Sequence, residues 1–194
     1  MDQVLSSSVL AFRLLAKDFE ILLEYVHPHE DNLRTYSHRI YELLLRASTE
    51  FEGLAKYGAS KYELLEVGRN TNIKDLSVLN TALDTKDAEI GLIGWQPHMR
   101  FITPLEGWGD DPHRLEWYRS YNAVKHDRSN TFHQANLKCL VFALGGCFLL
   151  LTHLGGIKFD PTEHIHHDDG VEWIFPAWPF SVRRQGDPPL DAFV

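Results

Sequence analysis

Cysteine is scarce in this sequence of 194 residues, which contains only Cys139 and Cys147. The two stand eight positions apart in an apolar stretch, a spacing that forms neither a CxxC motif nor a disulfide framework. Isolated thiols in such surroundings behave as small core residues. We therefore exclude the disulfide-rich secreted class and expect a protein of the reducing cytoplasm.

Long hydrophobic runs are also missing. The longest, residues 139–151, has 13 residues and contains two glycines, which is too short to cross a bilayer. The N-terminal residues lack the basic segment of a signal peptide. We therefore expect no membrane association.

The sequence has no excess of basic residues, because its net charge is −8. This excludes a general nucleic-acid coating protein, which is usually basic overall. Residues 113–138 nevertheless hold five basic and two acidic residues, a net +3 that leaves −11 for the rest. A local anion site and a solvated helix face both agree with this count.

Hydrophobic periodicity predicts a mostly α-helical fold, because apolar residues recur every three or four positions along most of the first 153 residues. The last periodic stretch is apolar on nearly all sides, which is typical of the central helix of a bundle. We expect an up-and-down bundle of about four to five helices. The expected helices span residues 6–27, 33–57, 72–83, 112–128 and 131–153.

Residues suited to helix ends set these boundaries. The predicted N-caps are Ser8, Asn72 (with Asp75 at the N3 position) and Asp111 (with Pro112 as the first helical residue). Gly58 is expected to end the second helix. Ser129 and Asn130 are expected to interrupt the chain before the last one.

Two further segments are not helical. Short stretches rich in isoleucine and aromatic residues flank a Gln-Pro-His sequence and predict a small β-hairpin or flap over 89–104. An aromatic segment, 173–180, is expected to pack back as an extended strap or to lie in an oligomer interface. We expect one domain, 1–156, which includes the flap, and an extended aromatic C-terminal tail, 157–194.

A functional site is indicated by Arg119, Asn122 and His126, whose offsets of zero, three and seven place them on one face of a helix. Cleavage of RNA without a metal needs a proton acceptor and donor, and a group that stabilises charge on the phosphorus. Histidine suits the proton transfers. Arginine is suited to stabilising the negative charge, because its planar guanidinium donates hydrogen bonds to two phosphate oxygens.

Neighbouring residues extend this site. Asn122 can donate to a phosphate oxygen or fix the imidazole tautomer. The basic residues expected to bind nucleic acid are Arg114, Lys125 and Arg128, and Lys125 is better placed around the helix to flank a groove than Arg128. The alternative is a structural role, in which the motif forms a buried polar network and Arg119 pairs with Glu50 or Glu116.

The segment from Arg119 to His126, RSYNAVKH, resembles the signature of the HEPN superfamily. In that signature an arginine is followed after four to six residues by a histidine, often with a polar residue between them, near the end of a bundle helix. The longer context WYRSYNAVKHDR, followed by an apolar helix, is similar to prokaryotic HEPN-like proteins.

The resemblance implies a helical bundle that forms a homodimer, with the motifs of two protomers facing each other in a composite cleft. Many members are metal-independent endoribonucleases of toxin–antitoxin or other defence systems, and others are non-catalytic scaffolds or bind nucleotides. It implies that Arg119, Asn122 and His126 are catalytic, without a cofactor. RNA, a nucleotide or a protein partner such as an antitoxin are the expected ligands.

Two other segments of the sequence could form a site. Residues 163–169 are rich in histidine and aspartate, and His164 and His166 would share one face of a strand, as a metal site requires. No distant ligand can be identified, so an exposed polar loop is favoured and no metal is expected. The aromatic segment 173–180 could be a docking surface for a protein partner, which would make the protein a helical interaction protein rather than a ribonuclease or a non-catalytic HEPN-like bundle.

Overall fold

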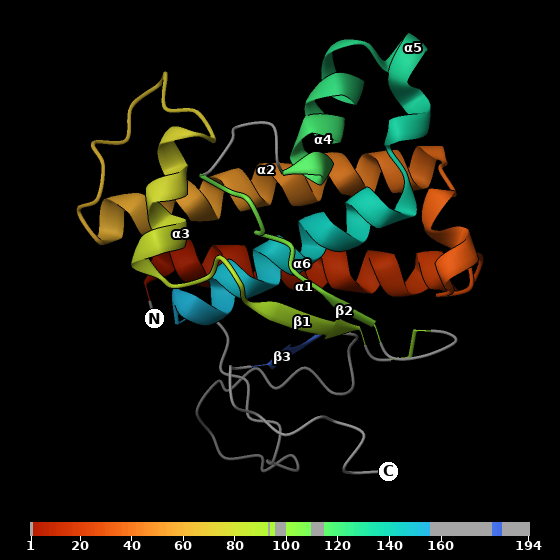
Figure 1. Cartoon of the computed structure of the whole chain (residues 1–194), viewed down its shortest axis with the longest axis horizontal. Helices are drawn as coiled ribbons and strands as arrows, with labels where there is room; N and C mark the ends of the chain where they lie inside the picture. The colour runs from red at the N-terminus through yellow and green to blue at the C-terminus, as the bar shows by residue number, and fades with distance from the viewer. Residues whose placement is uncertain (1, 93, 96–99, 110–114, 156–179, 184–194) are drawn as a thin grey trace.

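The computed structural model describes residues 2–92, 94–95, 100–109, 115–155 and 180–183 (Figure 1). The described chain is mostly helical with a small antiparallel sheet, which confirms the expected fold class. The helices are α1 (Gln3–Leu23), α2 (His38–Lys61), α3 (Val78–Ala82), α4 (Glu116–His126), α5 (Arg128–Thr131) and α6 (Leu137–His153). Short 3-10 turns are η1 (Glu30–Arg34), η2 (Asp75–Ser77) and η3 (Phe132–Gln134), and the strands are β1 (Glu89–Leu92), β2 (Arg100–Ile102) and β3 (Phe180–Arg183).

The centre of the bundle is the pair α2 and α6. Helices α1 and α4 each pack against both members of this pair. They do so on different sides, because α1 lies below α2 in Figure 1 and α4 stands above it. Thirteen of the 17 residues of α6 are buried, which confirms the expected central helix. The apolar character of α6 on nearly all sides follows from these neighbours.

Two adjacent glycines let other elements approach α6 closely. A Cβ at Gly145 would lie 3.3 to 3.4 Å from side-chain atoms of Ile90, Ile102 and Pro104, so the sheet packs there. A Cβ at Gly146 would lie 3.2 Å from two ring atoms of Phe51. Glycine is thus required in this helix by packing on its two sides, despite its cost in helix propensity.

Gly58 does not end the second helix, which was predicted to stop there. Helix α2 continues to Lys61, and Gly58 is buried within it. A Cβ at this position would lie 2.9 Å from a methyl group of Leu79 and 3.0 Å from one of Leu154. The glycine therefore serves the close packing of α3 and the end of α6, and the local rule for helix ends was wrong here.

The N-terminal boundaries of the first two helices also differ from prediction. Helix α1 begins at Gln3, because the Asp2 carboxylate accepts a hydrogen bond from the Val4 backbone N–H at 2.9 Å, and Ser8 lies inside the helix. It ends at Leu23 rather than His27. Helix α2 begins at His38 with Ser37 as its N-cap.

The hydrogen bonds expected of an N-cap at Asn72 are present, but the predicted helix does not begin there, because the first helical residue is Asp75 with Lys74 as the N-cap. The Asn72 side-chain oxygen accepts from the backbone N–H groups of Lys74 and Asp75, at 2.9 and 3.2 Å, and the Asp75 carboxylate accepts from the N–H of Asn72 at 3.0 Å. The helix that follows is divided into η2 and α3 and ends at Ala82. Asn80 is buried and donates to the Trp108 carbonyl at 2.8 Å, which ties α3 to the segment before the site.

The predicted hairpin is confirmed, since β1 and β2 pair antiparallel with Ile90 opposite Ile102. The sheet gains a third strand, with order β2-β1-β3, because β3 also pairs antiparallel with β1. The tail thus contributes residues 180–183 to the sheet, whereas the rest of the aromatic segment lies outside the described residues. The divisions at 156 and 157 stay predictions.

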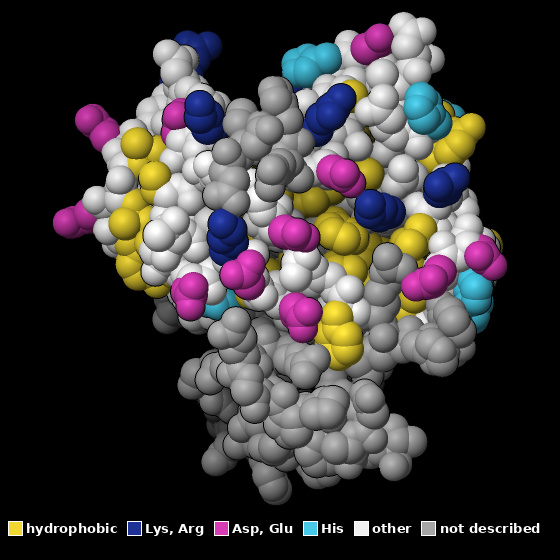
Figure 2. Space-filling model, in the orientation of Figure 1, with side chains coloured by type: hydrophobic (Ala, Val, Ile, Leu, Met, Phe, Trp, Pro, Cys, Tyr) yellow, Lys and Arg dark blue, Asp and Glu magenta, His cyan; other side chains and the backbone are white. Residues whose placement is uncertain are grey.

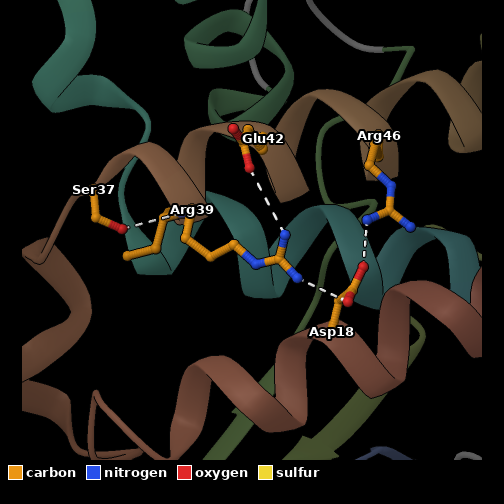
Figure 3. A network of polar contacts seen from close by, with 6 residues as sticks. Asp18, Ser37, Arg39, Glu42 and Arg46 are labelled. Atoms are coloured by element: carbon orange, nitrogen blue, oxygen red, sulfur yellow. Dashed lines mark hydrogen bonds and ion pairs between the residues drawn. The ribbon is translucent and has the colours of Figure 1, made fainter.

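An ion-pair network joins α1 to α2 (Figure 3). The Asp18 carboxylate accepts from Arg39 at 2.7 Å and from Arg46, and Arg39 also lies 3.7 Å from Glu42. The hydrogen bond from Arg46 and the charges of both arginines hold the pKa of Asp18 below its ordinary value, against the opposing effect of burial. Asp18 therefore stays ionised and fixes the side of α1 that faces α2.

Candidate functional site on helix α4

The motif lies on α4, whose inner face is aromatic. Trp117, Tyr118, Tyr121 and Val124 are buried, and the Trp117 indole N–H donates to the Pro104 carbonyl at 2.9 Å. Its ring packs edge-on against Phe51 of α2 with a centroid distance of 5.0 Å. This inner face fixes how α4 is rotated about its own axis.

The ends of α4 differ from the predicted 112–128. The helix begins at Glu116, since Leu115 is not helical, and the predicted Asp111 cap and Pro112 lie outside the described residues. It ends at His126, because Asp127 has φ −141° and ψ 63°. The predicted break at Ser129 and Asn130 is wrong: those two residues belong to α5, and the last helix, α6, starts at Leu137 with Asn136 as its N-cap.

Arg119, Asn122 and His126 lie on the side of α4 that faces away from the core. Arg119 and His126 are exposed and Asn122 is half-buried, whereas the positions between them include the buried aromatics. The predicted sharing of one helix face is therefore realised on the solvent side. Arg119 and His126 therefore belong to no network buried in the bundle, whereas half-buried Asn122 interacts with the Tyr118 side chain.

The structural partners proposed for Arg119 are not used. Glu116 instead accepts from Lys138 of α6 at 3.2 Å. Within the described part of the chain, no side-chain hydrogen bond or ion pair joins Arg119 to Glu50 or to His126. Arg119 and His126 are thus accessible to a ligand.

Lys125 lies beside this face but is engaged with the aromatic side of the helix. Its ammonium group donates to the Tyr121 hydroxyl at 3.0 Å and lies 5.1 Å from the centre of the Tyr121 ring. The hydrogen bond to Tyr121 raises the pKa of Lys125 above its ordinary value, so the side chain is a permanent cation at neutral pH.

A neighbouring contact anchors α4 to α2. The Tyr118 hydroxyl donates to the Glu52 carboxylate at 2.7 Å. Burial, followed by this bond to a carboxylate, raises the pKa of Tyr118 well above its ordinary value. Tyr118 is therefore a neutral hydrogen-bond donor across the accessible pH range and holds the helix at a fixed height over α2.

Arg128 does not belong to the motif helix. It is the first residue of α5, where its guanidinium donates to the His38 Nδ1 at 2.8 Å. The same group stacks over the rings of Tyr41 and Phe132, at 4.9 and 5.4 Å. This cluster attaches α5 and η3 to the first turns of α2. Arg114 lies outside the described residues.

His38, Tyr41 and Phe132 were not singled out from the sequence. No spacing pattern could have found them, because Arg128 and His38 are 90 positions apart and meet only through the packing of α5 on α2. In Figure 2, histidine, basic and acidic side chains lie together over the end of the molecule formed by α4 and α5. The excess of positive charge near the motif is therefore the modest net +3 of residues 113–138 within an acidic protein.

Other kinds of site find no support within the described ranges. No three histidine, cysteine, aspartate or glutamate side chains there come together as a metal site would require, and residues 163–169 lie outside those ranges. No helix in them is both long and apolar enough to cross a membrane. Both cysteines are free and buried, and burial raises their pKa values.

Comparison with known proteins found no family model, no curated protein and no solved structure that matches this chain.

Proposed function

We propose that this protein is a metal-independent endoribonuclease of the HEPN type, with Arg119, Asn122 and His126 as its catalytic residues. The observation that carries the proposal is the exposure of Arg119 and His126 on one face of α4, beside half-buried Asn122. Polar side chains held by a rigid helix and directed to solvent are suited to a ligand, whereas a structural network would be buried.

The spacing along the helix suits a phosphodiester. The Cα atoms of Arg119 and His126 are separated by two turns, about 10 Å along the axis, and Asn122 lies between them. A phosphate over Asn122 is within reach of both longer side chains. Arg119 would stabilise the negative charge on the phosphorane oxygens through its paired donors.

Proton transfers complete the reaction. A base takes the proton of the ribose 2'-hydroxyl, the 2'-oxygen attacks the phosphorus, and the bond to the 5'-oxygen breaks as an acid protonates that oxygen. The products are a 2',3'-cyclic phosphate and a 5'-hydroxyl. His126 supplies one of the two transfers. A water molecule at the site would supply the other.

The basic residues Arg114, Lys125 and Arg128 are proposed to hold the RNA on either side of the motif. Lys125 suits this role through its permanent charge beside the site. We place the activity in the cytoplasm, as a toxin or defence effector controlled by a protein partner.

A second candidate function, a non-catalytic bundle that binds RNA or a nucleotide, is favoured by one observation. Among the described residues no side chain or carbonyl bonds to the His126 ring through a side-chain hydrogen bond. A general acid or base is usually oriented by such a bond. The two functions make different demands on His126, so one experiment distinguishes them.

The experiment is RNA cleavage in EDTA by the wild type and by His126→Ala and Arg119→Ala. Loss of a proton-transfer residue typically lowers the rate by about 10² to 10⁴-fold, and we expect losses in this range, with cyclic phosphate ends in the wild-type products. The matched control is His133→Ala, an exposed histidine on η3, which should keep full activity.

Because Arg119 and His126 are exposed, neither substitution should change the free energy of unfolding by more than about 0.5 kcal/mol. If folded wild type leaves all RNAs intact while nucleotides raise its melting temperature, the binding function replaces the catalytic one. Equal activity of His126→Ala and wild type would exclude His126 as the catalytic group.

A further inference from the structure

Helix α1 presents an apolar stripe to solvent. Leu10, Leu14 and Ile21 are 55%, 53% and 41% exposed, and Tyr25, in the turn after the helix, is 81% exposed. At 100° per residue the three helical positions fall within an arc of about 40°. The buried residues of α1 lie on the opposite side: Leu5, Val9, Phe12, Leu15, Ala16, Phe19 and Leu22.

The core of the bundle gives no reason for these side chains. Clustered large apolar residues on a surface mark a site of interaction. Leu10, Leu14, Lys17 and Ile21 follow one another in steps of four, three and four, which is the spacing of a helix that packs along its length against another helix. The stripe from Leu10 to Tyr25 is about 22 Å long.

The charges beside the stripe identify what kind of helix fits. Arg13 and Lys17 lie along one edge in the first part of α1, and Glu20 and Glu24 lie along the same edge in the second part. In an antiparallel pair of identical helices this edge faces its own image with the direction reversed. Basic residues of one helix then lie beside acidic residues of the other. In a parallel pair this edge would instead face the opposite edge of the partner helix, where Asp18 is already bound by α2.

The opposite edge of the stripe is already engaged. Asp18 is bound by Arg39 and Arg46 of α2 (Figure 3). Within the described residues, by contrast, no ion pair involves Lys17, Glu20 or Glu24. One edge therefore holds α1 on its own bundle, and on the other edge Lys17, Glu20 and Glu24 are available for a partner.

We propose that the α1 stripe is a homodimer interface, in which α1 of a second copy of this chain packs antiparallel across Leu14 and Ile21. The two-fold axis lies near Lys17 and Asp18, so that Leu14 of each copy meets Ile21 of the other and Leu10 meets Tyr25. Lys17 of each copy lies next to Glu20 of the other.

This interface is independent of the proposed nuclease activity and differs from a composite cleft built from two motifs. Helix α4 stands on the other side of α2 from α1 in Figure 1. Contact through α1 therefore leaves Arg119 and His126 uncovered in both copies.

The first test is the molar mass of the full chain in solution, measured by sedimentation velocity over a range of concentrations. The wild type should be a dimer. Leu14→Glu should raise the dimer dissociation constant about 100-fold or more, because two leucines are lost from one interface. The matched control is Val78→Glu, an equivalent change at a residue of α3 that is 40% exposed, which should leave the dimer unchanged.

The second test uses charge. Lys17→Glu alone and Glu20→Lys alone each place like charges opposite one another twice and should weaken the dimer, whereas an equimolar mixture of the two variants should form a heterodimer as strong as the wild type. Circular dichroism should show all variants folded, since the sites are exposed. A monomeric wild type, a dimer that Leu14→Glu does not weaken, or a mixture no stronger than its components would overturn the proposal.

Discussion

The close approach of Phe51 to α6 gives the sharpest test of the packing. Gly146 is buried in α6, and the Cβ of an alanine there would lie 3.2 Å from the Cδ2 and Cε2 atoms of Phe51. The ring cannot withdraw, because it packs against Trp108 and Trp117 with centroid distances of 5.2 and 5.0 Å. Gly146→Ala therefore forces a shift in the most crowded part of the core.

The magnitude follows from two opposing effects. Alanine is favoured over glycine in a helix interior by about 1 kcal/mol, and overpacking a well-filled core costs about 1 to 3 kcal/mol. The net change for Gly146→Ala should be a loss of up to about 2 kcal/mol. Gly53→Ala is the matched control, since Gly53 is exposed within α2 and a Cβ there meets no atom within 4 Å. That variant should gain about 1 kcal/mol.

The free energy of unfolding of both variants is measured by urea unfolding, followed by the fluorescence of the five tryptophans. The informative quantity is the difference between the two substitutions, because the helix propensity is common to both and cancels. A stabilisation of Gly146→Ala equal to that of Gly53→Ala would show that Phe51 has room to move and that the contact with α6 is loose.

Two further substitutions test the contacts between helices. Asp18→Asn should lower the free energy of unfolding by about 1 kcal/mol near neutral pH, because Arg39 and Arg46 lose their anion. The pKa of Asp18 is lowered in the fold, so this stabilisation is present above about pH 4 and is lost as the pH falls through the folded-state pKa. Urea unfolding at several pH values should show the free energies of unfolding of variant and wild type converging in acid. A difference that stays constant with pH would contradict the ion pair. Tyr118→Phe should cost about 1 to 2 kcal/mol, since Glu52 loses a donor at 2.7 Å. The pKa of Tyr118 is raised in the fold, so the stabilisation that its hydrogen bond provides is full below about pH 10 and is lost as the pH rises towards the folded-state pKa. In a pH titration followed by phenolate absorbance, one of the seven tyrosines should ionise at a higher pH than the others, and the variant should lack that step.

The helix interiors were predictable because burial imposes a period on the sequence. The apolar stripe of α2, for example, repeats at Ile40, Leu43, Ala47 and Phe51, and all four are fully buried. Helix ends were less predictable, since several residues near each end can serve as caps. Both Asp2 and Ser8 are suited to an N-cap, and the structure uses Asp2, whose carboxylate accepts from the Val4 backbone N–H.

Gly58 shows a different kind of error. The residue type is favoured after a helix and also where two helices must approach closely, and the sequence near Gly58 does not distinguish the two. The decision is made by Leu79 and Leu154, which lie 21 and 96 positions later and contact the space that a Cβ would fill. Information of this kind is available only from the folded chain.

Part of the candidate site was predictable from the sequence and part was not. Its helical face was predictable from spacing alone, because Arg119, Asn122 and His126 depend only on the period of α4. The role of Arg128 was not, because α4 ends at His126 and Arg128 begins another helix. Its guanidinium is already bonded to His38 and stacked on Tyr41. An RNA phosphate at this end of the molecule would have to compete with these contacts for Arg128, whereas Arg119 has no such competitor among the described residues. The binding energy of the proposed site therefore depends more on Arg119 than the number of basic residues in 113–138 implies.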